Sequence, residues 1–168
     1  MQELQPDLHA ILETLEAGGV RFVLIGGLAM VLLGSDYITK DVDIVYARDA
    51  DNLAALVAAL NPMRPRLRGV PADLPFIFDV RTFQNVSNMT LMTDIGDLDL
   101  LGEAPGADSF EALWERSVTV ELDGFSIRVA SIDDLIAMKT AAGRPKDQNH
   151  VMELRALREL TASYNPAR

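Results

Sequence analysis

The sequence predicts one domain of the α/β (or α+β) class, in which helices pack on a mixed β-sheet and a β-hairpin and two helices complete the C-terminal part. Three observations support this fold. Apolar segments of strand length are gathered in the middle of the chain, with helical apolar spacing at both ends. Gly26-Gly27 stands where a strand pattern changes into a helical one. Asp123-Gly124 separates two short β-branched runs, which is typical of a hairpin.

The individual elements follow from apolar spacing and from the residues that end each segment. Gly18-Gly19 ends the first helix, Asp49 is a helix N-cap, and residues 143–145 separate the last two helices. The expected helices are 8–17, 28–33, 51–60, 110–116, 131–142 and 147–160, the expected strands are 20–25, 42–47, 76–83, 89–93, 97–101, 118–122 and 126–130, and 61–75 is expected to be a loop. We divide the domain into an N-terminal helix (1–19), a core (20–105) and a C-terminal hairpin with helices (106–168).

Composition excludes several kinds of chemistry. The 168 residues contain no Cys, so disulfides, thiolate zinc sites, iron–sulfur clusters and a Cys nucleophile are ruled out. His9 and His150 are far apart, so a His metal site or a Ser-His-Asp triad is not expected. The net charge of -10 disfavours extended nucleic acid as a partner. No secretory signal or membrane-spanning run is visible, which predicts a cytoplasmic protein without a membrane partner.

Acidic residues on predicted strands are the strongest functional signal. Asp41 and Asp43 alternate with apolar residues, so their side chains share one face of a strand, about 6.6 Å apart. Two such charges repel by about 2–3 kcal/mol at an effective dielectric near 20, and a divalent cation removes that cost. Asp99 and Asp79 have similar apolar flanks, and spacing does not decide which of them joins the pair. Two exposed acids on a solvated edge strand are the non-functional alternative.

The order of these motifs resembles a known superfamily. Gly26 and Gly27 at a strand-to-helix turn allow close approach of a ligand and offer N–H groups to phosphate. Together with residues 39–44 and the later Asp99 strand, they resemble the nucleotidyltransferase superfamily that includes DNA polymerase β. The chain looks most like a small bacterial branch that includes AbiEii-type toxins, and the resemblance extends over about residues 20–150.

The resemblance implies a role for each matching residue. Asp41, Asp43 and Asp99 would hold two divalent ions, Mg²⁺ or alternatively Mn²⁺, and Asp99 would also act as or orient the base for the attacking hydroxyl. Asp99 is preferred to Asp79 because its flanking segment matches the family. The residues implied to bind the nucleotide are Gly26, Gly27, Thr39, Lys40, Lys139, Arg144 and Lys146.

Other readings of the basic residues stay open. Lys139 could be an ordinary charge near a helix end, and Arg144 and Lys146 could bind the acceptor or merely pair with Asp147. Tyr37 stands where members of the branch often carry Arg, which removes a phosphate contact or passes it to Lys40. Three further Arg side chains form a basic cluster in the predicted loop, where solvation is preferred to binding of a nucleic-acid acceptor: Arg64, Arg66 and Arg68.

The function that the resemblance implies is Mg²⁺-dependent transfer of a nucleoside monophosphate from ATP or another NTP to a hydroxyl, with release of pyrophosphate. The acceptor hydroxyl could belong to RNA, to a protein or to a small molecule. A toxin-like role with a cognate antitoxin follows from the resemblance alone. The alternative is a catalytically silent nucleotide-binding or partner-binding module on the same fold, such as an antitoxin or regulator. The departure at Tyr37 favours that alternative, and the intact acids oppose it.

Overall fold

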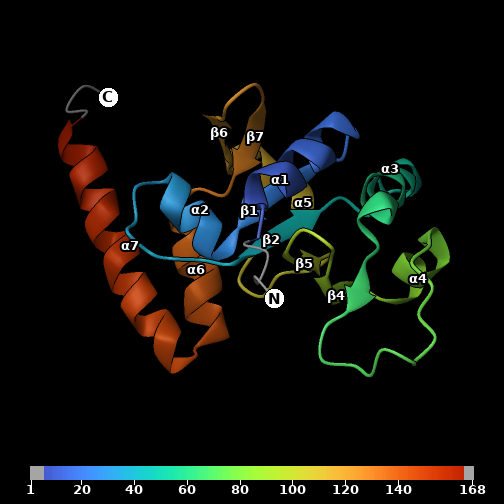
Figure 1. Ribbon diagram of the computed structural model, residues 1–168. Helices are drawn as coiled ribbons and strands as arrows, with labels where there is room; N and C mark the ends of the chain where they lie inside the picture. Colours follow the sequence, from blue (N-terminus) through green and yellow to red (C-terminus); the bar gives the residue numbers. More distant parts are fainter. Residues whose placement is uncertain (1–5, 165–168) are drawn as a thin grey trace.

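A computed structural model describes residues 6–164 of the protein. Within these residues one mixed seven-stranded sheet has the strand order β3-β4-β5-β2-β1-β7-β6 (Figure 1). The strands are β1 (Phe22–Ile25), β2 (Asp41–Tyr46), β3 (Arg66–Leu67), β4 (Asn88–Met92), β5 (Asp97–Leu101), β6 (Val118–Glu121) and β7 (Ser126–Val129). The helices are α1 (Leu8–Ala17), α2 (Gly26–Leu32), α3 (Ala50–Leu60), α4 (Val80–Asn85), α5 (Phe110–Arg116), α6 (Ile132–Ala142) and α7 (Pro145–Tyr164), with a short 3-10 turn, η1 (Asn61–Met63). The predicted α/β class is confirmed.

The central strands β2, β1 and β5 set the geometry of the sheet. β2 runs antiparallel to β1 and parallel to β5. Along β2, Val42 and Ile44 are fully buried and alternate with the half-buried Asp41 and Asp43. Alternate side chains of a strand point to opposite faces, so the apolar set enters the core and both acids face the other side.

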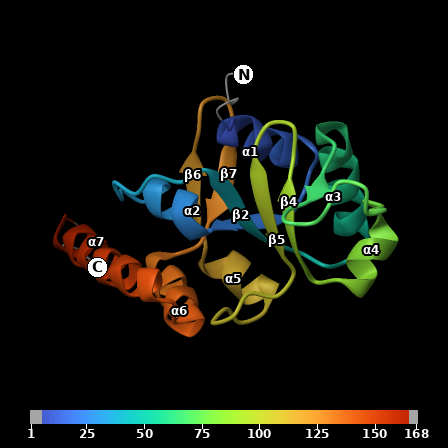
Figure 2. The ribbon, with the colours of Figure 1, turned by 60° about the horizontal axis from the view of Figure 1, so that its bottom comes forward.

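Helices cover both faces of the sheet. Figure 2 shows α1 and α3 on one side of the strands and α5 and α6 on the other. On the first side, α1 contacts α3, β2 and β7, and its Ile11 and Leu15 are buried. On the second side, α6 and α7 pack against each other beyond the strands. This arrangement leaves the acidic face of β2 opposite the turn between α6 and α7.

The C-terminal hairpin extends the main sheet. Its strand β7 pairs parallel with β1, and β6 pairs antiparallel with β7. A buried Asp134 on α6 accepts hydrogen bonds from Arg116 at the end of α5, at 2.6 and 3.1 Å, which ties these two helices together. The division of the chain at residues 19 and 105 stays a prediction.

Residues 76–83 differ from the sequence-based expectation. A strand was predicted here, but residues 76–78 have no regular structure and Val80–Asn85 is helix α4. The Asp79 side chain accepts a hydrogen bond from the Thr82 N–H at 2.8 Å and so caps the helix. Phe78 and Phe83 are buried with their rings 5.2 Å apart, so an apolar pattern that suits a strand is satisfied by a capped turn instead. The strand prediction is wrong.

Three smaller differences concern boundaries. The predicted loop 61–75 contains the two-residue strand β3, which pairs with β4. Helix α2 begins at Gly26, so the glycine pair forms its first turn, whereas the sequence predicted a start at Leu28. Helix α7 extends to Tyr164.

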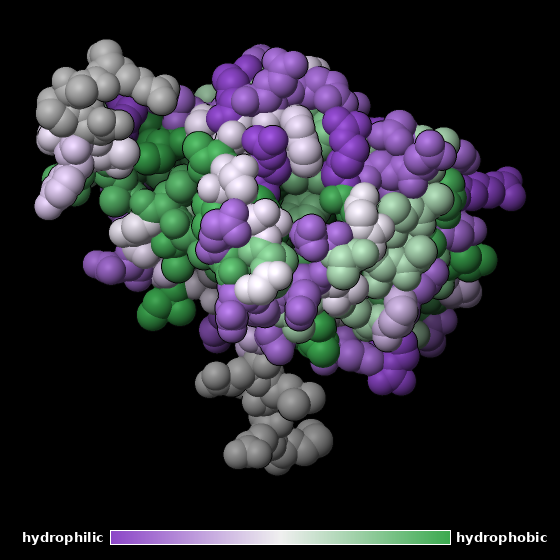
Figure 3. Space-filling model, turned by 90° about the horizontal axis from the view of Figure 1, so that it is seen from above, coloured by the Kyte–Doolittle hydropathy of each residue, from purple (hydrophilic) through white to green (hydrophobic). Residues whose placement is uncertain are grey.

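The surface hydropathy and the composition of the helices show whether a segment could cross a membrane. Seen from above, hydrophilic side chains cover much of the molecule, and hydrophobic ones gather on the side where α7 lies (Figure 3). Within residues 6–164, the helices are too short or too polar to cross a membrane.

Candidate active site

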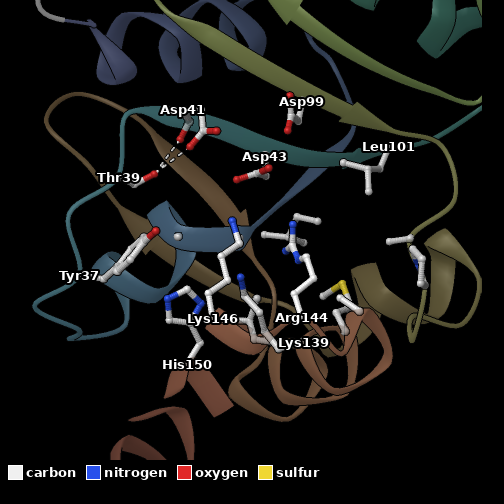
Figure 4. Close-up of a pocket in the computed structure, with 18 of the residues that line it drawn as sticks. Tyr37, Thr39, Asp41, Asp43, Asp99, Leu101, Lys139, Arg144, Lys146 and His150 are labelled. Carbon is white, nitrogen blue, oxygen red and sulfur yellow. Dashed lines mark hydrogen bonds between the residues drawn. The ribbon is translucent and has the colours of Figure 1, made fainter. Parts of the chain in front are cut away.

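A cavity of about 390 Å³ lies between the acidic face of the sheet and the α6–α7 turn (Figure 4). Carboxylates on β2 and β5 form one wall, and cationic side chains from α6 and from the start of α7 form the other. The residues with sequence-predicted roles that line it are Gly26, Gly27, Thr39, Asp41, Asp43, Asp99, Lys139, Arg144 and Lys146. The fold therefore gathers residues that lie more than a hundred positions apart in the sequence.

Asp41, Asp43 and Asp99 converge. Each offers a carboxylate oxygen, and the three oxygens lie within 4.8 Å of one another. Thr39 donates a hydrogen bond to Asp41 Oδ1 at 3.1 Å, so this threonine orients a carboxylate in the structure. The half-buried cluster fits a divalent cation, because its donors are hard carboxylate oxygens.

Burial and mutual repulsion raise the pKa values of two of the clustered carboxylates. Burial, and then the charges of Asp41 and Asp99, raise the pKa of Asp43 to about 7. Burial also raises the pKa of Asp99, although the Arg68 guanidinium acts in the opposite direction. The protein alone does not fully compensate these charges, and a divalent cation would do so.

Gly26 and Gly27 make room for two side chains of the site. Gly26 has φ +70, and a Cβ at this position would lie 2.7 Å from Asp43 Cγ. A Cβ on Gly27 would lie 2.6 Å from the Tyr37 ring. Larger residues would push the carboxylate and the aromatic ring out of place, so the glycines are explained by close approach within the protein.

The basic wall is organised by a buried acid. Asp147, at the start of α7, is 1% exposed and accepts hydrogen bonds from Arg144 Nε at 2.7 Å and from the Arg144 backbone N–H at 3.2 Å. Lys139 Nζ lies 3.4 Å from the same carboxylate. Hydrogen bonds from Arg144 hold the pKa of Asp147 down at about 2. Lys146 lines the cavity and forms no ion pair within the described part of the chain.

Two residues considered from the sequence lie elsewhere. Lys40 is exposed and is not part of the cavity wall. Asp79 caps α4 and does not join the carboxylate cluster, so the structure brings Asp99 into that place.

Of the basic loop cluster, two members face away from the cavity. Arg64 and Arg66 both pair with Asp94. Arg68 instead lines the cavity and contacts its acids.

Sequence reasoning did not place His150 in the site, and it treated Tyr37 only as a departure from the Arg of the family. Both line the cavity, with their rings 4.7 Å apart and nearly perpendicular. Burial, and then the Lys139 charge, lower the pKa of His150 below its ordinary value. The i,i+3 spacing of Arg144, Asp147 and His150 at the start of a helix was the available signal.

Comparison with known proteins identifies the family. Residues 2–162 match the model of the family described as "Nucleotidyltransferase of unknown function (DUF6036)". The chain belongs to this nucleotidyltransferase family. Its activity is therefore nucleotidyl transfer, and the predicted superfamily is confirmed.

Solved structures support the fold of this nucleotidyltransferase. The lincosamide antibiotic adenylyltransferase LnuA, solved with lincomycin, is 19% identical with a TM-score of 0.60, over 89% of this chain and 95% of that chain. ANT(2″)-Ia, solved with adenylyl-2″-tobramycin, is 15% identical with a TM-score of 0.58, over 94% and 88% of the two chains. No curated protein matches the sequence.

Proposed function

We propose that this nucleotidyltransferase uses divalent cations to transfer a nucleoside monophosphate from an NTP to a hydroxyl group of a small molecule, releasing pyrophosphate. The observation that carries the proposal is the cavity itself, in which three converging carboxylates face three cationic side chains. A triphosphate carries negative charge and is accompanied by cations. The cavity offers complementary groups for both.

The acidic wall supplies the ligands for the cation. We assign Asp41, Asp43 and Asp99 as the residues that hold it, with Thr39 keeping Asp41 in orientation. When bound, divalent ions neutralise phosphate charge and stabilise the attacking and leaving oxygens together. Mg²⁺ is the expected ion and Mn²⁺ the alternative, since both take oxygen ligands.

Proton transfer in this reaction falls to Asp99. The acceptor oxygen attacks the α-phosphorus, the bond from that phosphorus to the bridging oxygen of the β-phosphate breaks, and pyrophosphate leaves. The hydroxyl proton passes to the Asp99 carboxylate, or to water that Asp99 orients.

The basic wall holds the phosphates in line for attack. Lys139 on α6, Arg144 in the turn and Lys146 on α7 point toward Asp43 across the cavity (Figure 4). Asp147 fixes the first two by ion pairs, so they are oriented before substrate binds. Fixed positive charges of this kind lower the barrier by positioning and by charge stabilisation.

A small acceptor suits this protein better than nucleic acid. The net charge of -10 repels a phosphate backbone at long range. LnuA and ANT(2″)-Ia, which share the fold, were solved with lincomycin and with adenylyl-2″-tobramycin. NTPs are available in the cytoplasm, which we propose as the site of the reaction. A toxin-like role and a cognate antitoxin stay predictions from the resemblance.

The test uses each α-³²P-labelled NTP with Mg²⁺ and separate panels of hydroxylated small molecules, RNA and proteins. We expect a labelled small-molecule product with the wild-type chain and a loss of about 10³-fold or more with Asp43→Asn. Asp123→Asn, at an exposed hairpin turn, is the matched control and should keep full activity. Label found only on RNA or protein contradicts the acceptor class, and full activity of Asp43→Asn contradicts the site.

A further inference from the structure

Arg68 brings a positive charge onto the carboxylates of the active site. Its Nη2 lies 2.8 Å from Asp99 Oδ1, and its Nη1 lies 3.2 Å from Asp97 Oδ2 and 3.8 Å from Asp41 Oδ2. Two of these acids, Asp41 and Asp99, are cation ligands in the proposed function. The guanidinium therefore contacts two of the three carboxylates that a divalent cation would also need.

The three carboxylates of the cluster differ in their ion pairing. Asp43 forms no ion pair within residues 6–164, whereas Asp41 and Asp99 both face Arg68. A guanidinium neutralises carboxylates by hydrogen bonds of nearly 3 Å, while Mg²⁺ requires oxygens at about 2.1 Å in octahedral order. A cation that enters the cluster must share Asp41 and Asp99 with the guanidinium, and the two positive charges repel.

We propose that Arg68 is a positioning residue that competes with the divalent cation for Asp41 and Asp99. In the cation-free protein it holds these two carboxylates together, and it turns away from them, toward Asp97, when a cation enters. This inference rests on the proposed function, because it takes the three acids as the cation site.

The surroundings of Arg68 permit such a turn. Its backbone is fixed, because its N–H bonds to the Thr90 carbonyl at 3.0 Å next to strand β3. Its side chain is 30% exposed, so the guanidinium already reaches the solvent. Asp97 is 41% exposed and stands beside Asp41 in the β2–β5 register, which leaves Arg68 an acid to bind after it moves.

The test measures the affinity of the full chain for Mn²⁺ by calorimetry, without nucleotide. We expect Arg68→Gln to bind Mn²⁺ about tenfold more tightly than the wild type, because a competing charge is gone. Arg66→Gln is the matched control: it removes the same charge two residues earlier, on strand β3, where Arg66 pairs with Asp94 instead, and should change the affinity less than twofold.

A second variant and a second readout guard against misfolding. Arg68→Lys keeps the positive charge but loses the simultaneous contacts of two guanidinium nitrogens. It should bind Mn²⁺ two- to fivefold more tightly than the wild type. Mn²⁺ should also raise the midpoint of thermal unfolding more for Arg68→Gln than for the wild type. A structural role alone would not increase cation affinity.

Two outcomes would overturn the inference in different ways. Unchanged or weaker Mn²⁺ binding by both Arg68 variants, with normal binding by the wild type, refutes the competition and leaves the proposed function standing. Failure of every variant to bind Mn²⁺, together with nucleotidyl transfer that persists in EDTA, refutes the cation site and the competition together.

Discussion

Asp43 and Asp99 are register partners in the parallel ladder between β2 and β5. The same register places Asp41 opposite Asp97. Side chains of paired residues in parallel strands project to the same face, so the acids are brought together by the backbone pairing itself. The site therefore depends on a strand pairing that joins residues more than fifty positions apart.

The first prediction tests which acid completes the cluster. Asp99→Asn should lower nucleotidyl transfer about 10³-fold, because it removes a ligand oxygen and the proposed proton acceptor. Asp79→Asn should keep activity within about twofold, since Asn is also a good N-cap for α4. The rate of labelled product formation at saturating NTP measures both. A larger loss from Asp79→Asn than from Asp99→Asn contradicts the assignment.

The sequence alone identified Asp41 and Asp43 as a pair but left Asp99 and Asp79 undecided on spacing. The alternation of β2 is a local pattern, and it suffices to put two acids on one face. The third acid depends on which strand lies beside β2, and this pairing is not encoded in the alternation of either strand. Asp79 was ambiguous because Phe78 and Val80 flank it as apolar residues flank an acid on a strand, although Asp79 caps helix α4.

The second prediction concerns the glycine beside Asp43. Gly26→Ala should reduce transfer about 100-fold, because its Cβ would displace the Asp43 carboxylate. Gly19→Ala is the matched control: Gly19 has φ +69, against +70 for Gly26, but no atoms within 4 Å of a Cβ. Both variants have a similar backbone cost of about 1 kcal/mol, and Gly26→Ala adds the clash with Asp43, so we expect a somewhat lower unfolding midpoint and a much lower activity for Gly26→Ala alone. Equal activities would show that the approach to Asp43 is unimportant.

The third prediction separates two lysines. Lys146→Gln should raise the KM for the NTP about five- to tenfold with a smaller change in kcat, since it removes one charge-assisted contact to phosphate. Lys40→Gln should leave both constants unchanged, because Lys40 is exposed and stands outside the cavity wall. Steady-state kinetics with varied NTP give both values. A larger rise in KM for Lys40→Gln than for Lys146→Gln would show that Lys40, not Lys146, contacts the NTP.

The basic wall was only partly predictable. Lys139, Arg144 and Lys146 were marked because the segment resembles the family, and pairing of Arg144 with Asp147 was an open alternative. The structure shows that pairing, and Arg144 still lines the cavity. Arg68 could not be distinguished from its neighbours by charge. Its place depends on strand β3, which has only two residues and no clear pattern in a Pro-rich loop.

The fourth prediction uses the depressed pKa of Asp147, which is about 2 in the folded protein against an ordinary value of 3.8. A carboxylate with a lowered folded-state pKa stabilises the fold above its unfolded pKa, and this stabilisation is lost as the pH falls through the folded value. Asp147→Asn should therefore lower the free energy of unfolding by about 2–3 kcal/mol at pH 6, and the difference should shrink steadily between pH 4 and pH 2.

Urea unfolding of both proteins across this pH range provides the measurement. Asp133→Asn is the control, because Asp133 also forms an ion pair, with Arg158 at 2.8 Å, but its side chain is 75% exposed. Exposed pairs contribute little, so this variant should stay within about 0.5 kcal/mol of the wild type at every pH. A difference for Asp147→Asn that does not depend on pH would mean that its carboxylate charge is not what stabilises the basic wall.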